Sequence, residues 1–261
     1  TCLLRVAYLK DKSEPKNAAA AFGEVSARYP GTREAAEADY RRGMVCERGR
    51  QNIDEAIRAL EAAAENRQAT SFVRQAAAVE AGYARIMKYM GSASKPDVQA
   101  AADYIKRIIP TVTDCELLAR ARLAYGECCL EIEGGPEDAP PPLEEALERH
   151  EADYIGQAET AFKAVLSSKC SAYVKLTAWY YLGHALPMEG EKAEAKRCLD
   201  QVLAGLKGAT LKEKQKDWVR LRGMKTANGH AAGWSMHVQW NYMVQMAAWW
   251  QAEMLRSMGL K

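Results

Sequence analysis

Apolar residues recur at helical spacing in the later part of the chain. Trp179, Leu182 and Leu186 stand at positions i, i+3 and i+7, so they share one face of a helix. Gly183 lies within this stripe, and its missing side chain lets a second helix approach closely. After a turn at Gly190, the second helix carries Ala195, Leu199 and Val202. The pattern predicts two antiparallel helices in which Gly183 contacts Ala195, with Trp179 and Leu199 in the same core.

These residues resemble the tetratricopeptide (TPR) pattern W-x2-L-G-x2-Y … A-x3-F, with Leu186 in place of the tyrosine. One helix pair cannot bury both of its faces, so a good match predicts neighbouring pairs. Further first-helix glycines stand at Gly43, Gly82 and Gly126. Their second-helix partners are, in chain order, Ala56 and Leu60, then Ala100 and Tyr104, then Ala158, Phe162 and Val165. An earlier pair, whose first helix begins near Cys2, is indicated by Ala18, Phe22, Val25 and Pro30.

The resemblance implies an all-α fold, a right-handed α-solenoid of about five TPR-like helix pairs with a C-terminal capping helical segment. The repeats cover residues 1–206, with an acidic, proline-rich insertion at about 133–152, and residues 207–261 hold a basic helix and the C-terminal helix. Hydrophobic residues make up 48% of the chain, close to the globular average. No apolar run is long enough to span a membrane, so membrane insertion is not expected.

The segment from Ser26 to Tyr40 joins a Tyr-Pro junction to a run of alanines. It is similar to the repeats of bacterial cell-envelope TPR adaptors of the Tol–Pal-associated and outer-membrane-assembly lipoprotein families. Cysteine usage favours another compartment, because the chain has 7 cysteines, an odd number, and none in C-x2-C spacing. A cytoplasmic location is therefore favoured, and the bacterial envelope is the alternative.

The histidines and cysteines of this sequence show no catalytic or metal-binding pattern. The four histidines are scattered and no H-E-x-x-H is present, so neither a metal site nor a cofactor is expected. The cysteines at repeat positions are expected to be small buried hydrophobes: Cys46, Cys128, Cys129 and Cys198.

Two charged segments depart from a plain repeat array. The insertion at 133–152 and its flanks hold nine acidic residues against Arg149, which indicates a solvated loop or a docking site for a basic partner. The segment from Lys207 to Lys225 is basic around Trp218. A solvated helix face is the favoured interpretation there, because no nucleic-acid-binding motif accompanies the charge. The two segments could also attract each other, within one chain or between chains.

A C-terminal helix is predicted at about 235–258. The segment from Thr226 through Ala252, which includes most of this helix, contains no Asp, Glu, Lys or Arg. A heptad-like apolar face runs along it, consisting of Met236, Trp240, Met243, Trp250 and Met254. This face either caps the last repeat, with residues 210–226 folded back over it, or forms a homo-oligomer or partner interface.

The TPR resemblance also implies which first-helix residues line a concave groove. Carried over by position, they are Glu37, Tyr40, Met44, Arg48, Tyr83, Met87, Arg120, Glu127, Tyr180 and His184. The predicted function is a non-enzymatic protein–protein interaction scaffold or adaptor that binds a peptide or helical segment in this groove. The alternative is a structural protein that oligomerises through its C-terminal helix, and a helical-repeat enzyme is a third hypothesis.

Overall fold

The computed structural model of the chain describes residues 2–13, 15–49, 52–92, 95–134, 153–186 and 192–207. Within these ranges every regular element is helical, with ten α-helices, one short 3-10 helix and no strand. The prediction of an all-α fold is therefore confirmed. The chain divides into two compact units, Thr1–Ala124 and Tyr125–Lys261, and each is considered by itself.

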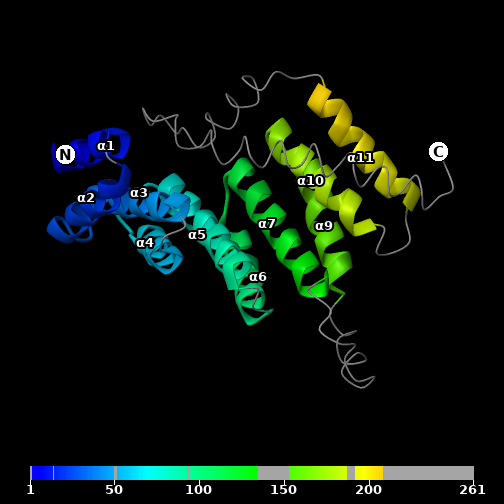
Figure 1. The fold of residues 1–261 in the computed structure, drawn as a ribbon, viewed down its shortest axis with the longest axis horizontal. Helices are drawn as coiled ribbons and strands as arrows, with labels where there is room; N and C mark the ends of the chain where they lie inside the picture. The colour runs from blue at the N-terminus through cyan, green and yellow to red at the C-terminus, as the bar shows by residue number, and fades with distance from the viewer. Residues whose placement is uncertain are drawn as a thin grey trace. The chain divides into compact units, whose positions relative to one another are not determined.

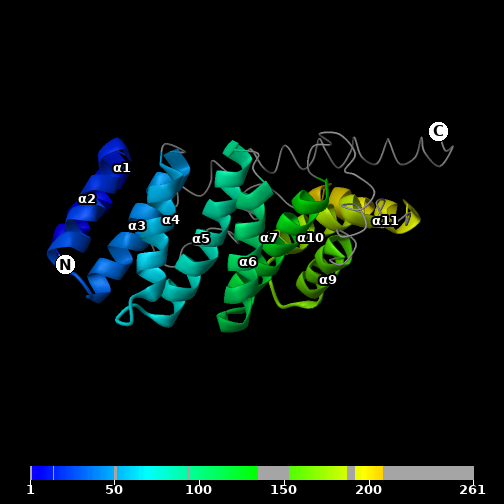
Figure 2. The same cartoon turned by 90° about the horizontal axis from the view of Figure 1, so that it is seen from below.

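The first unit is a row of helix pairs in which each helix from α1 to α6 contacts the next (Figures 1 and 2). Its helices are α1 (Cys2–Ser13), α2 (Pro15–Arg28), α3 (Arg33–Gly49), α4 (Ile53–Glu65), α5 (Ser71–Ser92), α6 (Lys95–Ile108), η1 (Ile109–Thr111) and the first part of α7 (Cys115–Gly134). Contacts also join α1 to α3 and α3 to α5. The first helices of successive pairs therefore touch one another, as expected for stacked repeats.

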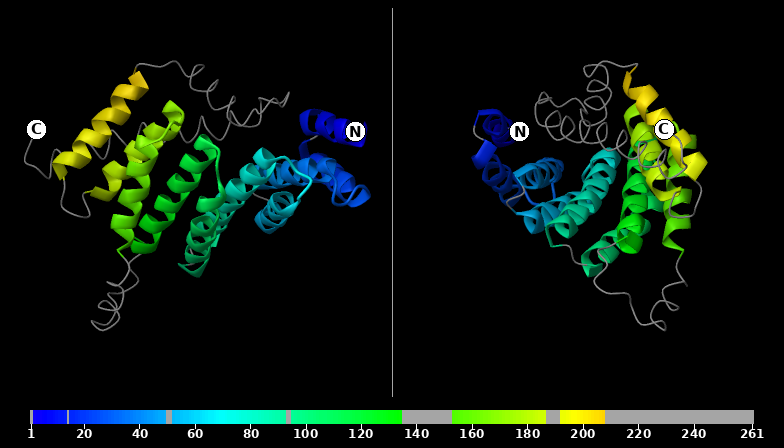
Figure 3. Two further views of the ribbon diagram at one scale, coloured as in Figure 1. Left: turned by 180° about the vertical axis from the view of Figure 1, so that it is seen from behind. Right: turned by 45° about the vertical axis from the view of Figure 1, so that its right-hand side comes forward.

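Among its described residues, the second unit contains the remainder of α7 together with three further helices (Figure 3). These are α9 (Tyr154–Ser167), α10 (Ala172–Ala185) and α11 (Lys192–Lys207). Helix α10 contacts both α9 and α11. The predicted pair around Trp179 corresponds to α10 and α11, and the pair of Gly126 with Phe162 corresponds to α7 and α9.

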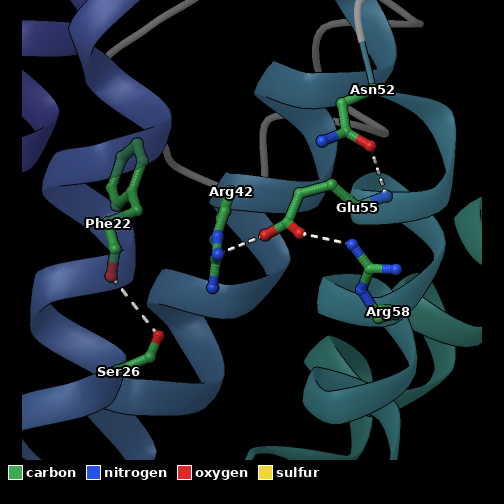
Figure 4. A network of polar contacts seen from close by, with 6 residues as sticks. All are labelled: Phe22, Ser26, Arg42, Asn52, Glu55 and Arg58. Atoms are coloured by element: carbon green, nitrogen blue, oxygen red, sulfur yellow. Dashed lines mark hydrogen bonds and ion pairs between the residues drawn. The ribbon is translucent and has the colours of Figure 1, made fainter.

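Polar residues just before the helices set where they begin. Asn52 Oδ1 accepts a hydrogen bond from Glu55 N at 3.0 Å at the start of α4 (Figure 4), and Asp153 Oδ1 accepts one from Gly156 N at 2.7 Å at the start of α9. Asp114, Thr32 and Thr70 act in the same way before α7, α3 and α5. Each side chain satisfies an N–H that has no partner within its helix, which stabilises the helix end by about 1 kcal/mol.

The glycines of the first helices lie where a large side chain of the second helix crosses. A Cβ on Gly183 would lie 3.0 Å from Leu199 Cδ2 and 3.3 Å from Ala195 O, so the predicted approach of Gly183 to Ala195 is confirmed. Gly43 faces Leu60, and Gly126 faces the ring of Phe162. Leu199 is buried and Trp179 is half-buried.

One predicted pairing is wrong by a single residue. Gly82 was matched with Ala100 and Tyr104, but a Cβ on Gly82 would lie 2.8 Å from Ile105 Cγ1 and 3.9 Å from Tyr104 Cδ1. Ala100 is exposed, whereas Ala101 and Ile105 are buried. The Tyr104 ring instead lies at the border of the core, where the guanidinium of Arg85 covers it at 4.0 Å. A polar hydroxyl favours this border position over the centre of the core.

Several predictions fall outside the residues that the structure describes. These are the turn at Gly190, the insertion at 133–152 apart from its first two residues, the basic segment beyond Lys207, and the C-terminal helix with Met236, Trp240, Met243, Trp250 and Met254. The boundary between residues 206 and 207 remains a prediction.

Candidate functional site

The predicted groove residues all lie on the first helices of pairs. Glu37, Tyr40, Met44 and Arg48 belong to α3, Tyr83 and Met87 to α5, Arg120 and Glu127 to α7, and Tyr180 and His184 to α10. The side chains of Arg48 and His184 lie outside the described part of the chain. Residues up to Arg120 belong to the first unit, and Glu127, Tyr180 and His184 belong to the second.

A cluster of Tyr8, Glu37, Tyr40 and Arg41 joins α1 to α3. Tyr8 Oη donates a hydrogen bond to Glu37 Oε1 at 2.5 Å, and Arg41 Nε donates to Tyr8 Oη at 3.1 Å. The Arg41 guanidinium lies 5.4 Å from the ring centres of both Tyr8 and Tyr40. Burial raises the pKa of Tyr8 far above its usual range, so its hydroxyl remains a neutral donor. The cluster fixes Glu37 and Arg41 at the surface of α3.

A second cluster, Glu80, Tyr83 and Arg120, joins α5 to α7. Arg120 Nη2 and Glu80 Oε1 are 2.8 Å apart, with their side chains 6% and 1% exposed. Tyr83 Oη donates to Arg120 O at 3.1 Å, and the guanidinium lies 5.2 Å from the Tyr83 ring centre. Burial lowers the pKa of Arg120, but Glu80 and the nearby hydroxyls of Tyr83 and Tyr40 raise it overall. Arg120 therefore remains charged.

The predicted groove residues of the first unit differ in exposure. Tyr40 is 4% exposed and Met44 and Arg120 are 5% exposed, so these three mainly contact other residues of the chain. Glu37, Tyr83 and Met87 are half-buried, so part of each side chain remains exposed to solvent. Sequence reasoning missed the supporting residues Tyr8, Arg41 and Glu80. Helical spacing could have found two of them, because Arg41 is four residues after Glu37 and Glu80 is three before Tyr83.

In the second unit, Tyr181 interacts with both of the predicted residues Glu127 and Tyr180. Its ring makes an edge contact with Tyr180 at 5.3 Å and stacks on Phe162 at 5.6 Å. Loss of water contact raises the pKa of Glu127 to about 7, Tyr181 lowers it by hydrogen bonding, and Glu131 raises it further. Tyr180 is only 8% exposed. Glu127 therefore titrates near neutral pH beside an aromatic cluster.

A small surface cleft of about 230 Å³ in the first unit was not anticipated from the sequence. It lies among α4, α5 and α6, and its lining residues are Asp54, Ile57, Arg58, Arg85, Lys88, Asp97 and Ala100. Lys88 Nζ pairs with Asp54 Oδ1 at 2.9 Å, and Arg85 Nη2 pairs with Glu61 Oε1 at 2.5 Å. Arg58 pairs with Glu55 at 2.8 Å, and Arg42 reaches the other oxygen of that carboxylate (Figure 4). The charges around this cleft thus largely neutralise one another.

The cysteines are free thiols, and several of them are buried in the packing between helices. All 7 cysteines are free; Cys128, Cys129 and Cys198 are buried as predicted, whereas Cys46 is half-buried. Burial raises the pKa of Cys198 to about 12 and that of Cys128 further, so both remain protonated. Within the described ranges, no three His, Cys, Asp or Glu side chains are grouped closely enough to hold a metal ion. The helices described there also include none with the length and hydrophobicity of a membrane span.

Comparison with known proteins supports the fold. A crystal structure described as nearly identical TPR-like repeats, from a protein of Podosopora anserina named as a kinesin light chain, superposes with a TM-score of 0.51. The match covers 78% of this chain and 93% of that chain at 13% sequence identity. No protein-family model matches the sequence, and no curated protein does. The similarity to bacterial cell-envelope adaptors is unsupported by these comparisons and remains a prediction. The chain thus has a TPR-like helical-repeat fold.

Proposed function

We propose that this chain is a protein–protein interaction scaffold that binds an extended or helical segment of a partner along its first helices. The observation that carries the proposal is the pair of Tyr–Arg–Glu clusters on α1, α3, α5 and α7 of the first unit. They hold half-buried Glu37 and Tyr83 in fixed positions on α3 and α5, and half-buried Met87 lies one helical turn after Tyr83. Prearranged side chains bind a partner at a lower entropic cost than mobile ones.

The chemistry of this face fits a partner segment with both apolar and polar residues. Met87 and the ring of Tyr83 offer apolar surface, which contributes affinity when water is excluded. Glu37 offers a carboxylate beside the guanidinium of Arg41, 3.6 Å away. A carboxylate held in this way favours a donor on the partner, such as a lysine, an arginine or a backbone N–H.

The experiment is a pull-down with the intact protein as bait, followed by measurement of the identified partner's affinity. Tyr83→Ala with Met87→Ala should weaken binding about thirtyfold to a thousandfold, because each of the two removed contacts is worth about 1–2 kcal/mol. Arg58→Ala with Lys88→Ala, on the cleft of the same unit, is the control and should retain affinity. Circular dichroism checks that helicity is unchanged in both variants. Equal affinity of the first variant and the wild type would exclude these first-helix residues as the binding face.

A further inference from the structure

Side-chain hydrogen bonds join the turns between repeats of the first unit into one continuous edge. Asn66 Nδ2, after α4, donates to Thr32 O, before α3, at 3.1 Å. Near the start of α5, Gln75 Oε1 accepts hydrogen bonds from Thr113 N at 2.8 Å and Asp114 N at 3.0 Å, just before α7. The turns that follow α2, α4 and α6 therefore lie beside one another, and we call this surface the turn edge.

Five exposed cations border the turn edge: Arg28, Arg33, Arg67, Arg74 and Lys106. Within the part of the chain that the structure describes, none of these five side chains takes part in an ion pair or hydrogen bond. Six other cations of the same unit differ from these five. Arg41, Arg42, Arg58, Arg85, Lys88 and Arg120 all pair with a carboxylate.

Helix stability does not account for all of these positions. Arg28 and Lys106 lie in the last turns of α2 and α6, where a cation interacts favourably with the helix dipole. Arg33 is the first residue of α3, and Arg74 lies in the first turn of α5. A positive charge at a helix N-terminus is electrostatically unfavourable. Arg33 and Arg74 are therefore placed against the local helix dipole, with no intramolecular partner to offset this among the described residues.

The carboxylates nearby indicate which kind of anion fits. Glu34 lies in the first turn of α3 and Glu65 is the last residue of α4, so this edge carries negative as well as positive charges. A nucleic-acid backbone presents a charge at every nucleotide and would be repelled at these points. A polypeptide can place its acidic residues at intervals, and guanidinium groups bind carboxylates through two parallel hydrogen bonds. Tyr29, 41% exposed beside Arg28, adds an aromatic surface for one apolar side chain.

We propose that the turn edge binds an acidic segment of a partner protein, with Arg33, Arg67 and Arg74 as its main contacts. This surface is distinct from the first-helix face of the proposed function. The two sites could bind different segments of one partner, or two different partners.

The test uses the full chain and a fluorescein-labelled peptide of alternating glutamate and serine, followed by fluorescence anisotropy. Arg67→Gln with Arg74→Gln should raise the dissociation constant about fivefold to tenfold, because two exposed ion-pair contacts are lost. The matched control is Arg5→Gln with Lys10→Gln on α1, which removes the same charge from two exposed cations without a described partner. Its dissociation constant should change less than about twofold. A third variant, Arg67→Lys with Arg74→Lys, should bind with intermediate affinity, because lysine keeps the positive charge but cannot form the two parallel hydrogen bonds of a guanidinium with a carboxylate.

Other outcomes would overturn the proposal. The peptide could fail to bind, or the control variant could lose as much affinity as the edge variant, which would indicate attraction to net charge alone. An oligonucleotide of equal formal charge that binds more tightly, and responds to the same substitutions, would identify nucleic acid as the ligand. Tyr83→Ala with Met87→Ala should leave peptide binding intact, so failure of one proposed site can be told from failure of the other.

Discussion

Glycine residues determine how closely the two helices of a pair approach each other. At Gly126, a side chain would meet the ring of Phe162, whose Cζ lies 2.6 Å from the position of a Cβ. The ring has little room to move, because it stacks on Tyr181 at an interplanar angle of 11°. Gly183 faces Leu199 in the corresponding place of the last described pair, with slightly more space.

We expect Gly126→Ala to lower the free energy of unfolding by about 1–3 kcal/mol, because the added methyl group overpacks the contact with Phe162. Gly183→Leu should have an effect of similar size for the same reason. The control is Gly23→Ala in α2, where a Cβ would lie 3.4 Å from the flexible guanidinium of Arg42. That substitution should be neutral or stabilise by up to about 1 kcal/mol, since alanine favours helix. Urea denaturation compares the three, and a stable Gly126→Ala would contradict the close contact.

Glu127 should make stability depend on pH. Its pKa is about 7 in the folded protein against an ordinary 4.5, so the folded state holds a proton that the unfolded chain releases. The free energy of unfolding should therefore fall as the pH rises from 4.5 to about 7, by on the order of 2 kcal/mol, and stay constant above that range. Denaturation at pH 5 and pH 8 measures this change. Glu127→Gln should lose most of it, whereas exposed Glu65→Gln should keep it.

At the scale of elements, α5 and α7 are joined by the buried ion pair of Glu80 and Arg120. Arg120→Met should lower the free energy of unfolding by about 3–5 kcal/mol, because it leaves the Glu80 carboxylate buried without its cation. Glu80→Leu combined with Arg120→Met should recover most of that loss, since an apolar pair avoids burying charge. Thermal and urea denaturation of the single and double variants separate these effects. Equal losses in both would mean that shape, not charge, dominates the contact.

For α6, the sequence leaves open which residues face the preceding helix. The existence of α6 follows from its apolar spacing, but Ala100 and Ala101 are both small, and both Tyr104 and Ile105 are large enough to face Gly82. Packing selected Ala101 and Ile105 for the core, because Arg85 covers the Tyr104 ring at the border. A shift of one residue turns a helix by about 100°, so the ambiguity changes which side chain faces Gly82.

At the scale of the whole molecule, the sequence-based hypotheses for the C-terminal helix predict different masses in solution. Trp240→Glu with Trp250→Glu should give a less stable monomer if the helix caps the repeats, because buried charge is costly. If the helix instead builds an oligomer, the wild type should be a dimer and the variant should be a stable monomer. Light scattering measures the mass and calorimetry the melting temperature. No change in either quantity would contradict both hypotheses.

The all-α class, the helix pairs and four of the five first-helix to second-helix pairings could be predicted from the sequence. These depend on spacing along the chain, namely apolar stripes and a glycine in four of the five first helices. The tertiary structure was needed to show which polar side chains meet, because stacked helices bring together residues far apart in sequence, as with Tyr8 and Glu37 or Glu80 and Arg120. It also showed that Tyr40 and Met44 are buried within the chain, and that the turns of the first unit form the continuous turn edge. Exposure and long-range pairing depend on how repeats stack, which local spacing does not specify.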